Sequence, residues 1–152
     1  MHATAGTTGE TWAGYARRTL GRAGYRESAP RTRVVYTLAE LGCSVTARDI
    51  EDRVQSSGRR IGLASVYRTL ELLAELGLVQ RFEVGEGVAR YEPALPSGEH
   101  HHHLVCDRCG GVTPFEDGAR ERAIEQLSGR VDFAIDAHDV TLRGECPACR
   151  AG

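Results

Sequence analysis

The sequence predicts an α+β protein in which a helical domain with a β-hairpin precedes a smaller domain of strands and helices. Three observations lead to this fold class. Segments with helical spacing of apolar residues are followed by two β-prone runs around a glycine-rich turn. A segment with two prolines, 93–99, interrupts the pattern. Two Cys-x-x-Cys pairs and a run of four histidines lie beyond it, which indicates a second domain with its own chemistry.

The helices of the first part are predicted from apolar spacing and from residues that begin and end helices. A short helix is expected over 11–20. The next helix has Ser28 as a candidate N-cap and ends at Gly42. Thr46 can cap a third helix over 47–55, with an acidic residue at its third position. These signals predict consecutive short helices separated by tight turns.

A fourth helix is predicted from Ser65 to Leu76, after the opening residues Gly62-Leu63-Ala64. Its apolar residues share one face, and Tyr67 and Arg68 lie off that face. Two β-prone runs, 78–84 and 88–92, then enclose the glycine-rich turn. Helices followed by such a hairpin are the order of a winged helix-turn-helix domain.

The chain is therefore divided into a winged-helix domain over 1–92, a hinge linker over 93–99 and a small C-terminal α/β domain over 100–152. In the last part, a strand leads into the first cysteine pair and a helix is expected over 118–127. The segment 133–142 alternates enough in polarity to predict a strand or hairpin.

Charge is distributed unevenly between the two parts. The net charge is −2, and all 19 basic residues are arginine. Residues 1–91 contain 13 Arg and 10 acidic residues (net +3), and residues 92–152 contain 6 Arg and 11 acidic residues (net −5). The planar guanidinium suits phosphate and guanine. Since no apolar run is long enough to span a bilayer and no signal-peptide pattern is evident, a cytoplasmic protein without membrane contact is expected.

The cysteine spacing predicts a structural zinc site. Cys106-x-x-Cys109 is followed after 36 residues by Cys146-x-x-Cys149. Two intervening residues allow both thiolates of a pair to bind one tetrahedral ion, and four thiolates leave no open position for catalysis. The alternative interpretation is two unrelated redox pairs.

The histidine run His100-His101-His102-His103 leads directly into the cysteine-bearing strand. Because side chains alternate on a strand, the first and third histidines are expected to face one way and the second and fourth the other. Imidazole binds zinc, nickel, copper and iron. A tag or a solvated loop is the alternative interpretation. More distant candidates for completing these half-sites are Glu92, Glu121 and His138.

Taken together, these segments resemble the ferric uptake regulator (Fur) family. The resemblance covers roughly residues 12–150 and is carried by Gly62-Leu63-Ala64-Ser65-Val66-Tyr67-Arg68-Thr69-Leu70, by His100 to Gly110 (HHHHLVCDRCG), and by His138, Gly144, Cys146 and Cys149. It implies a metal-dependent transcriptional repressor of metal homeostasis genes and not an enzyme. It also implies a homodimer that binds a pseudo-palindromic operator in double-stranded DNA.

The resemblance assigns roles to individual residues. The helix from Ser65 to Leu76 would be the recognition helix, with Tyr67 and Arg68 contacting bases and phosphates in the major groove. Arg26 would reach toward the minor groove. A core aromatic residue is the alternative interpretation of Tyr67.

The resemblance also groups the metal ligands. The structural zinc would be held by Cys106, Cys109, Cys146 and Cys149. A second site, within the dimerisation domain, would use His100, His102, Glu121 and His138. A regulatory site at the hinge would use His101, His103, Glu92 and Cys43. Cys43 stands near the position where the family often has a histidine, and its alternative role is that of a small buried apolar residue.

The regulatory metal is left open between zinc and iron(II), with nickel, manganese or peroxide sensing as further alternatives. Zinc is favoured because His102 replaces an aspartate common in iron sensors, and because a cysteine near the hinge suits zinc. Pro114 stands where those sensors often carry an acidic residue. Two other functions are considered, a zinc hydrolase and a metal-storage protein. The hydrolase is disfavoured because no His-Glu-x-x-His motif is present.

Overall fold

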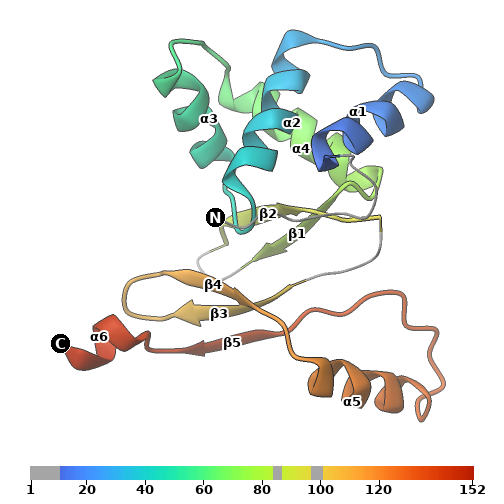
Figure 1. Cartoon of the computed structure of the whole chain (residues 1–152), viewed down its shortest axis with the longest axis vertical. Coiled ribbons are helices and arrows are strands. Elements are labelled where there is room, and N and C mark those ends of the chain that lie inside the picture. Colours follow the sequence, from blue (N-terminus) through green and yellow to red (C-terminus); the bar gives the residue numbers. More distant parts are fainter. Residues whose placement is uncertain (1–10, 84–86, 97–100) are drawn as a thin grey trace. The chain divides into compact units, whose positions relative to one another are not determined.

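The computed structural model describes residues 11–83, 87–96 and 101–152 and contains two compact units, Met1–Glu99 and His100–Gly152 (Figure 1). In unit 1 the elements are α1 (Trp12–Arg22), α2 (Ala29–Leu41), α3 (Ala47–Ser56), α4 (Leu63–Glu75), β1 (Val79–Glu83) and β2 (Ala89–Pro93). In unit 2 they are β3 (His102–Cys106), β4 (Val112–Phe115), α5 (Gly118–Ser128), β5 (Thr141–Gly144) and α6 (Pro147–Ala151). No helix in the described part of the chain has the length and apolar character of a membrane span.

The capping residues of unit 1 act as the sequence predicts. The Ser28 hydroxyl accepts a hydrogen bond from the backbone N–H of Arg31 at the start of α2. Thr46 and Asp49 form a reciprocal capping box at α3, with N···O distances of 3.0 and 2.8 Å. Helix α2 ends at Gly42, whose φ of 81° lies in the region that favours glycine.

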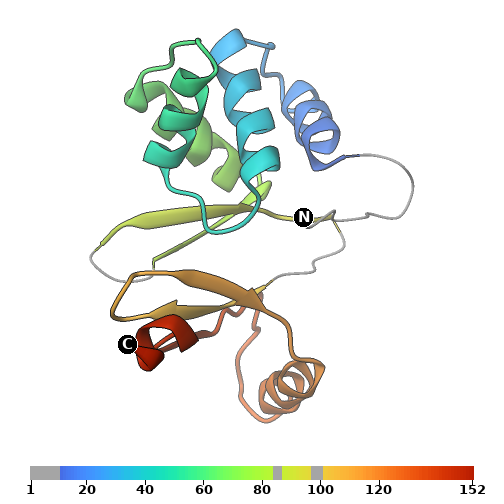
Figure 2. The same cartoon turned by 60° about the vertical axis from the view of Figure 1, so that its left-hand side comes forward.

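The helices enclose the apolar core of unit 1, and the hairpin lies along one side of them (Figure 2). The fully buried side chains include Val34, Val35, Leu38, Ile50, Val66, Leu70 and Leu73. Trp12 joins α1 to the start of the hairpin, because its indole N–H donates to the Leu78 carbonyl at 3.0 Å. The α2–α3 turn is fixed to β2 by a two-way backbone bridge between Val45 and Tyr91.

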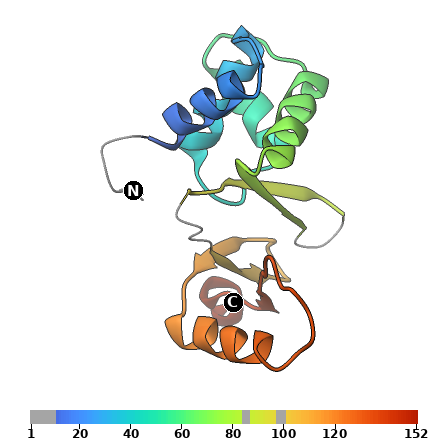
Figure 3. The ribbon, with the colours of Figure 1, turned by 90° about the vertical axis from the view of Figure 1, so that its right-hand side faces the viewer.

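Unit 2 is a three-stranded sheet in the order β4-β3-β5. Strand β3 pairs antiparallel with β4 and parallel with β5, with Cys106 opposite Gly144 in the parallel register. Helices α5 and α6 lie at opposite ends of this sheet (Figures 1 and 3). Both ends of β3 are therefore close to another element that carries polar side chains.

The structure corrects parts of the expected secondary structure. The strand or hairpin expected over 133–142 was wrong for 133–140, since β5 begins only at Thr141. Strand β4 was not predicted; it contains Pro114, which is tolerated because β4 is an edge strand. Helix α4 begins at Leu63, before the expected Ser65. The predicted linker overlaps β2 at Pro93, and residues 97–99 of it lie outside the described residues.

Unit 2 has a thin apolar core. Among its described residues, Val105 and Cys106 are the buried apolar side chains. Several large apolar side chains are exposed instead: Leu104, Leu127, Val131, Phe133, Ile135 and Leu142. Phe133 is the most exposed, at 81%. A unit of this size cannot be stabilised by so little apolar burial, so other cross-links are needed.

Candidate metal centres and nucleic-acid interface

The four paired cysteines form one cluster. Cys106 ends β3, and Cys146 lies two residues after Gly144, the last residue of β5. Since these strands are parallel, their carboxyl ends meet at the same edge of the sheet, and both pairs are brought together there. The four Sγ atoms lie within 4.8 Å of one another, and Cys109 Sγ is 3.9 Å from Cys146 Sγ. A tetrahedral zinc with Zn–S bonds of about 2.3 Å needs a separation of about 3.8 Å, so the cluster fits the ion.

The electrostatics of the cluster favour a cation. Backbone N–H groups, first that of Cys146 and then that of Cys109, lower the pKa of the Cys106 thiol to about 6. Hydrogen bonding with the Cys146 and Cys109 side chains raises the pKa of Cys149 to about 12. One thiol therefore ionises readily, whereas hydrogen bonding, with a smaller contribution from the negative charge of Cys106, opposes ionisation of another. A bound divalent cation removes this opposition because it interacts with all four thiolates.

A second cluster lies at the opposite end of β3. His102 Nε2 is 2.5 Å from Glu121 Oε1, and His138 Nε2 is 2.9 Å from Glu121 Oε2. Glu121 comes from the first turn of α5, and His138 from the segment before β5. The three side chains offer two nitrogens and one carboxylate within 4.8 Å of one another. This donor set fits zinc, iron(II) or manganese and leaves a coordination position for a further ligand.

The surroundings of His102 fix its ring. The backbone N–H of Val140 donates to its Nδ1 at 3.2 Å, which turns Nε2 toward Glu121. The Phe115 ring lies 5.5 Å from the imidazole, and His102 is fully buried. The predicted fourth member of this group, His100, lies outside the described residues.

The residues predicted for the hinge site are distributed over both units. His103 is buried in β3, and His101 Nε2 lies 3.1 Å from Glu116 Oε1, a contact that the sequence did not indicate. In unit 1, burial raises the pKa of the Cys43 thiol, and the negative charge of nearby Glu92 adds to the increase. This grouping of ligands stays a prediction.

Helix α4 presents a polar face of the kind that binds nucleic acid. Tyr67 is 44% exposed and Arg68 is exposed, while Thr69 and Leu70 on the other face are buried. The Arg68 guanidinium lies 3.5 Å from the Ser65 hydroxyl one turn earlier. The alternative interpretation of Tyr67 as a core aromatic does not agree with this exposure.

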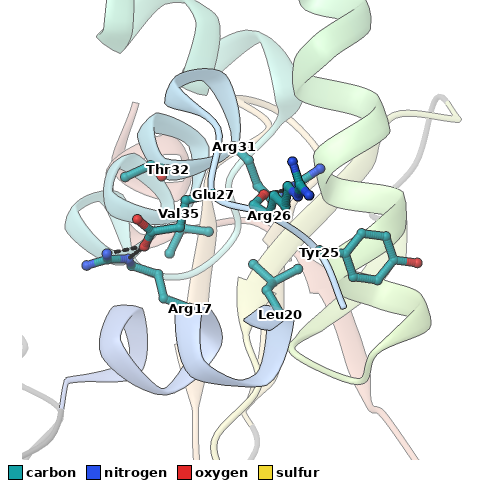
Figure 4. Close-up of a pocket in the computed structure, with 8 residues that line it drawn as sticks. All are labelled: Arg17, Leu20, Tyr25, Arg26, Glu27, Arg31, Thr32 and Val35. Carbon is teal, nitrogen blue, oxygen red and sulfur yellow. Dashed lines mark hydrogen bonds and ion pairs between the residues drawn. The ribbon is translucent and has the colours of Figure 1, made fainter. Parts of the chain in front are cut away.

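The loop that carries Arg26 is held from two sides (Figure 4). Arg17 of α1 forms an ion pair with Glu27 and donates to the Tyr36 hydroxyl at 2.9 Å. Arg31 of α2 donates to the Arg26 carbonyl at 2.5 Å. The backbone of the loop is thereby fixed, while the Arg26 side chain is exposed.

Comparison with known proteins identifies this arrangement. The model of the ferric uptake regulator family matches residues 22–143. The chain belongs to the ferric uptake regulator family. Membership of this family confirms the resemblance and the fold class that were inferred from the sequence. The chain is therefore a metal-responsive DNA-binding regulator and not an enzyme.

Individual Fur proteins are similar over most of their length. The ferric uptake regulation protein of Bacillus subtilis is 41% identical over 106 residues, which cover 69% of this chain and 71% of the relative. That of Legionella pneumophila is 34% identical over 132 residues, with 86% and 96% covered. The crystal structure of the Vibrio cholerae ferric uptake regulator superposes with a TM-score of 0.74 at 29% identity, and covers 86% of this chain and 98% of that one.

Proposed function

We propose that this chain is a metal-activated repressor that binds a pseudo-palindromic operator as a homodimer and controls genes of metal homeostasis. The observation that carries the proposal is that β3 contributes one residue to each of two candidate metal clusters, and that these clusters differ in their ligand atoms. The Cys106 cluster offers a closed set of four ligands, and the Glu121 cluster offers three ligands among the described residues. A closed thiolate site suits a permanent ion, and an open nitrogen–oxygen site suits an ion that exchanges with its surroundings.

Sequence-specific DNA contact is assigned to α4. Tyr67 and Arg68 are exposed on this helix, and Ser65 is half-buried at its first turn beside Arg68. One bidentate arginine–guanine contact contributes roughly 1–3 kcal/mol of discrimination. Arg26, on the fixed loop before α2, contributes a minor-groove contact in this proposal.

Dimerisation is assigned to unit 2, with a second copy of this chain as the partner. Strand β5 is an edge strand, and all the large exposed apolar side chains of the unit except Leu104 lie before it or in it, from Leu127 to Leu142. Covering Phe133 and its neighbours would supply the apolar burial that unit 2 lacks on its own. A two-fold dimer also presents two copies of α4 to the two half-sites of an operator.

The switch is assigned to His101, His103, Glu92 and Cys43. In this proposal a metal ion at these residues fixes the spacing of the two DNA-binding units in the dimer. Because metal and DNA both bind the same state, each raises the affinity for the other by the same factor.

Two effector metals are proposed. Zinc is favoured by the ligand set, because His102 supplies nitrogen at a position where an aspartate is common in iron sensors. Iron(II) is favoured by the relatives, since the Bacillus and Legionella proteins are both named for ferric uptake regulation. The relatives cover most of this chain, and they move the balance toward iron(II).

The experiment is a DNA-binding titration of the purified full chain on its own promoter region at one fixed salt concentration. Zinc, iron(II), manganese and nickel are added separately at controlled free concentrations, the iron under anaerobic conditions. The effector is the metal that activates binding at a free concentration available in the cell. Arg68→Gln is expected to weaken specific binding at least tenfold, whereas Arg48→Gln, on the exposed face of α3, serves as the matched control. Metal-independent affinity for every DNA tested would contradict the repressor and revive the storage function.

A further inference from the structure

The two cysteine pairs are joined by more than their thiols. The first pair begins at the last residue of β3 and the second begins two residues after the end of β5. Because these strands are parallel, the two turns lie side by side beside α6 (Figure 1). The backbone N–H of Asp107 donates to the Gly144 carbonyl at 2.8 Å, and that of Cys146 points to Cys106 Sγ at 3.3 Å. Asp107 and Arg108 are the two spacer residues between Cys106 and Cys109. The Cys-x-x-Cys pattern does not specify which residues stand at these two positions.

The Arg108 side chain contacts the second pair, and the Asp107 side chain contacts β5, the strand that leads into it. Arg108 donates to the Cys149 carbonyl at 2.5 Å and lies 4.0 Å from the Glu145 carboxylate. Asp107 forms an ion pair with Arg143 at 2.5 Å. These side chains thus contact residues before the second pair and one residue within it.

We propose that Asp107 and Arg108 are positioning residues that hold the second cysteine pair against the first and slow the loss of the structural zinc. The proposal rests on the assignment of that zinc to the four cysteines. It adds a function for side chains that do not bind the metal.

The local structure explains why the second pair needs holding. Cys149 lies on α6, which has only five residues. Such a helix has little stability of its own, and its last carbonyls have no partner within the helix. The Arg108 guanidinium satisfies one of these carbonyls and places a positive charge at the negative end of the helix.

The contacts of the spacer residues act by position and add little net charge. A zinc bound by four thiolates carries a net charge of about −2. The positive charges of Arg108 and Arg143 near this ion are offset by the Glu145 and Asp107 carboxylates that they contact. All four ion-pair side chains are about half exposed, so each contact has a modest effect. We expect removal of the Arg108 contacts to speed metal release about three- to tenfold.

The test measures release of cobalt(II) from the substituted full chain after addition of excess chelator. Thiolate-bound cobalt absorbs by charge transfer, so the signal reports the cysteine cluster and not the Glu121 cluster. Arg108→Gln and Asp107→Asn should both release the ion faster than wild type, with an unchanged cobalt spectrum. The difference should shrink as salt is added, because the contacts are exposed.

Two further variants make the result decisive. Arg150 follows Cys149 in the sequence, and its side chain has no partner in the described part of the chain. Arg150→Gln removes the same charge as Arg108→Gln, and this variant should release cobalt at the wild-type rate. The double variant Asp107→Arg with Arg143→Asp exchanges the two partners of the ion pair. It should release cobalt more slowly than either of its single variants. Equal rates for Arg108→Gln and Arg150→Gln, or no restoration in the exchanged pair, would overturn the proposal. If wild type gives no thiolate–cobalt absorption, the zinc assignment itself is wrong.

Discussion

Replacing Glu121 by glutamine separates the charge of the second metal cluster from its shape. Glu121 contacts His102 with one carboxylate oxygen and His138 with the other, at 2.5 and 2.9 Å. The Glu121→Gln side chain has the same length but is neutral, and one of its two oxygens becomes an NH₂ group. A divalent cation in this cluster therefore loses its one described anionic ligand.

The size of the effect follows from the loss of that ligand. We expect metal affinity to fall about 100-fold. This is the upper end of the loss of affinity that substitutions around a metal site cause. At free metal 100 times above the wild-type Kd, binding stabilises wild type by about 2.7 kcal/mol and the variant by only about 0.4 kcal/mol. Without metal, the variant should lose at most about 1 kcal/mol, since Glu121 is one-third exposed.

The assay is chelator-competed metal binding, combined with urea unfolding of the full chain with and without the metal. Glu125→Gln is the matched control, since Glu125 is exposed on the same helix and outside the cluster. The reasoning is refuted if Glu121→Gln and Glu125→Gln bind the second metal equally well. Both variants should retain the structural zinc, because the cysteine cluster lies at the other end of β3.

Two further changes probe the stability of each unit. Cys146→Ser should release the structural zinc and make unit 2 sensitive to limited proteolysis, because little apolar burial remains to hold it, whereas Cys43→Ser should keep its zinc. Trp12→Phe should lower the free energy of unfolding of unit 1 by about 1–2 kcal/mol in urea titrations followed by circular dichroism. The loss is limited because the Leu78 carbonyl also accepts from the Ala94 N–H, so a change above about 4 kcal/mol would contradict this interpretation.

Local signals explain which parts of the fold were predictable. Ser28, Gly42 and the Thr46–Asp49 box act within a few residues of themselves, so the sequence determines these helix ends without tertiary information. The segment 133–140 shows the limit of the approach. Its alternating apolar residues resemble a strand, but Phe133 and Ile135 are exposed in the described part of the chain. Alternation of apolar and polar residues indicates that a segment has an apolar face. It does not indicate which surface covers that face.

The candidate site divides in the same way. The cysteine spacing alone predicts the cluster chemistry, because two intervening residues impose the local geometry of each pair. The contact between Glu121 and His138 bridges 17 residues and depends on where α5 packs, which no local rule supplies; only the resemblance paired them. The contact of His101 with Glu116 and the cross-links from Asp107 and Arg108 were missed for the same reason, since exposed charges carry no signal of their partners.

The thin core of unit 2 gives a physical reason for two clusters of unlike chemistry. Cys106 lies four positions after His102 on β3, which corresponds to about 13 Å along an extended strand. If both ions exchanged freely, loss of metal would unfold the unit, since Val105 and Cys106 are its buried apolar residues within the described range. A thiolate-bound ion that stays in place keeps β3 and β5 together. We therefore expect that the Glu121 cluster can lose and regain its metal while β3, which also carries His103 of the proposed switch, remains folded.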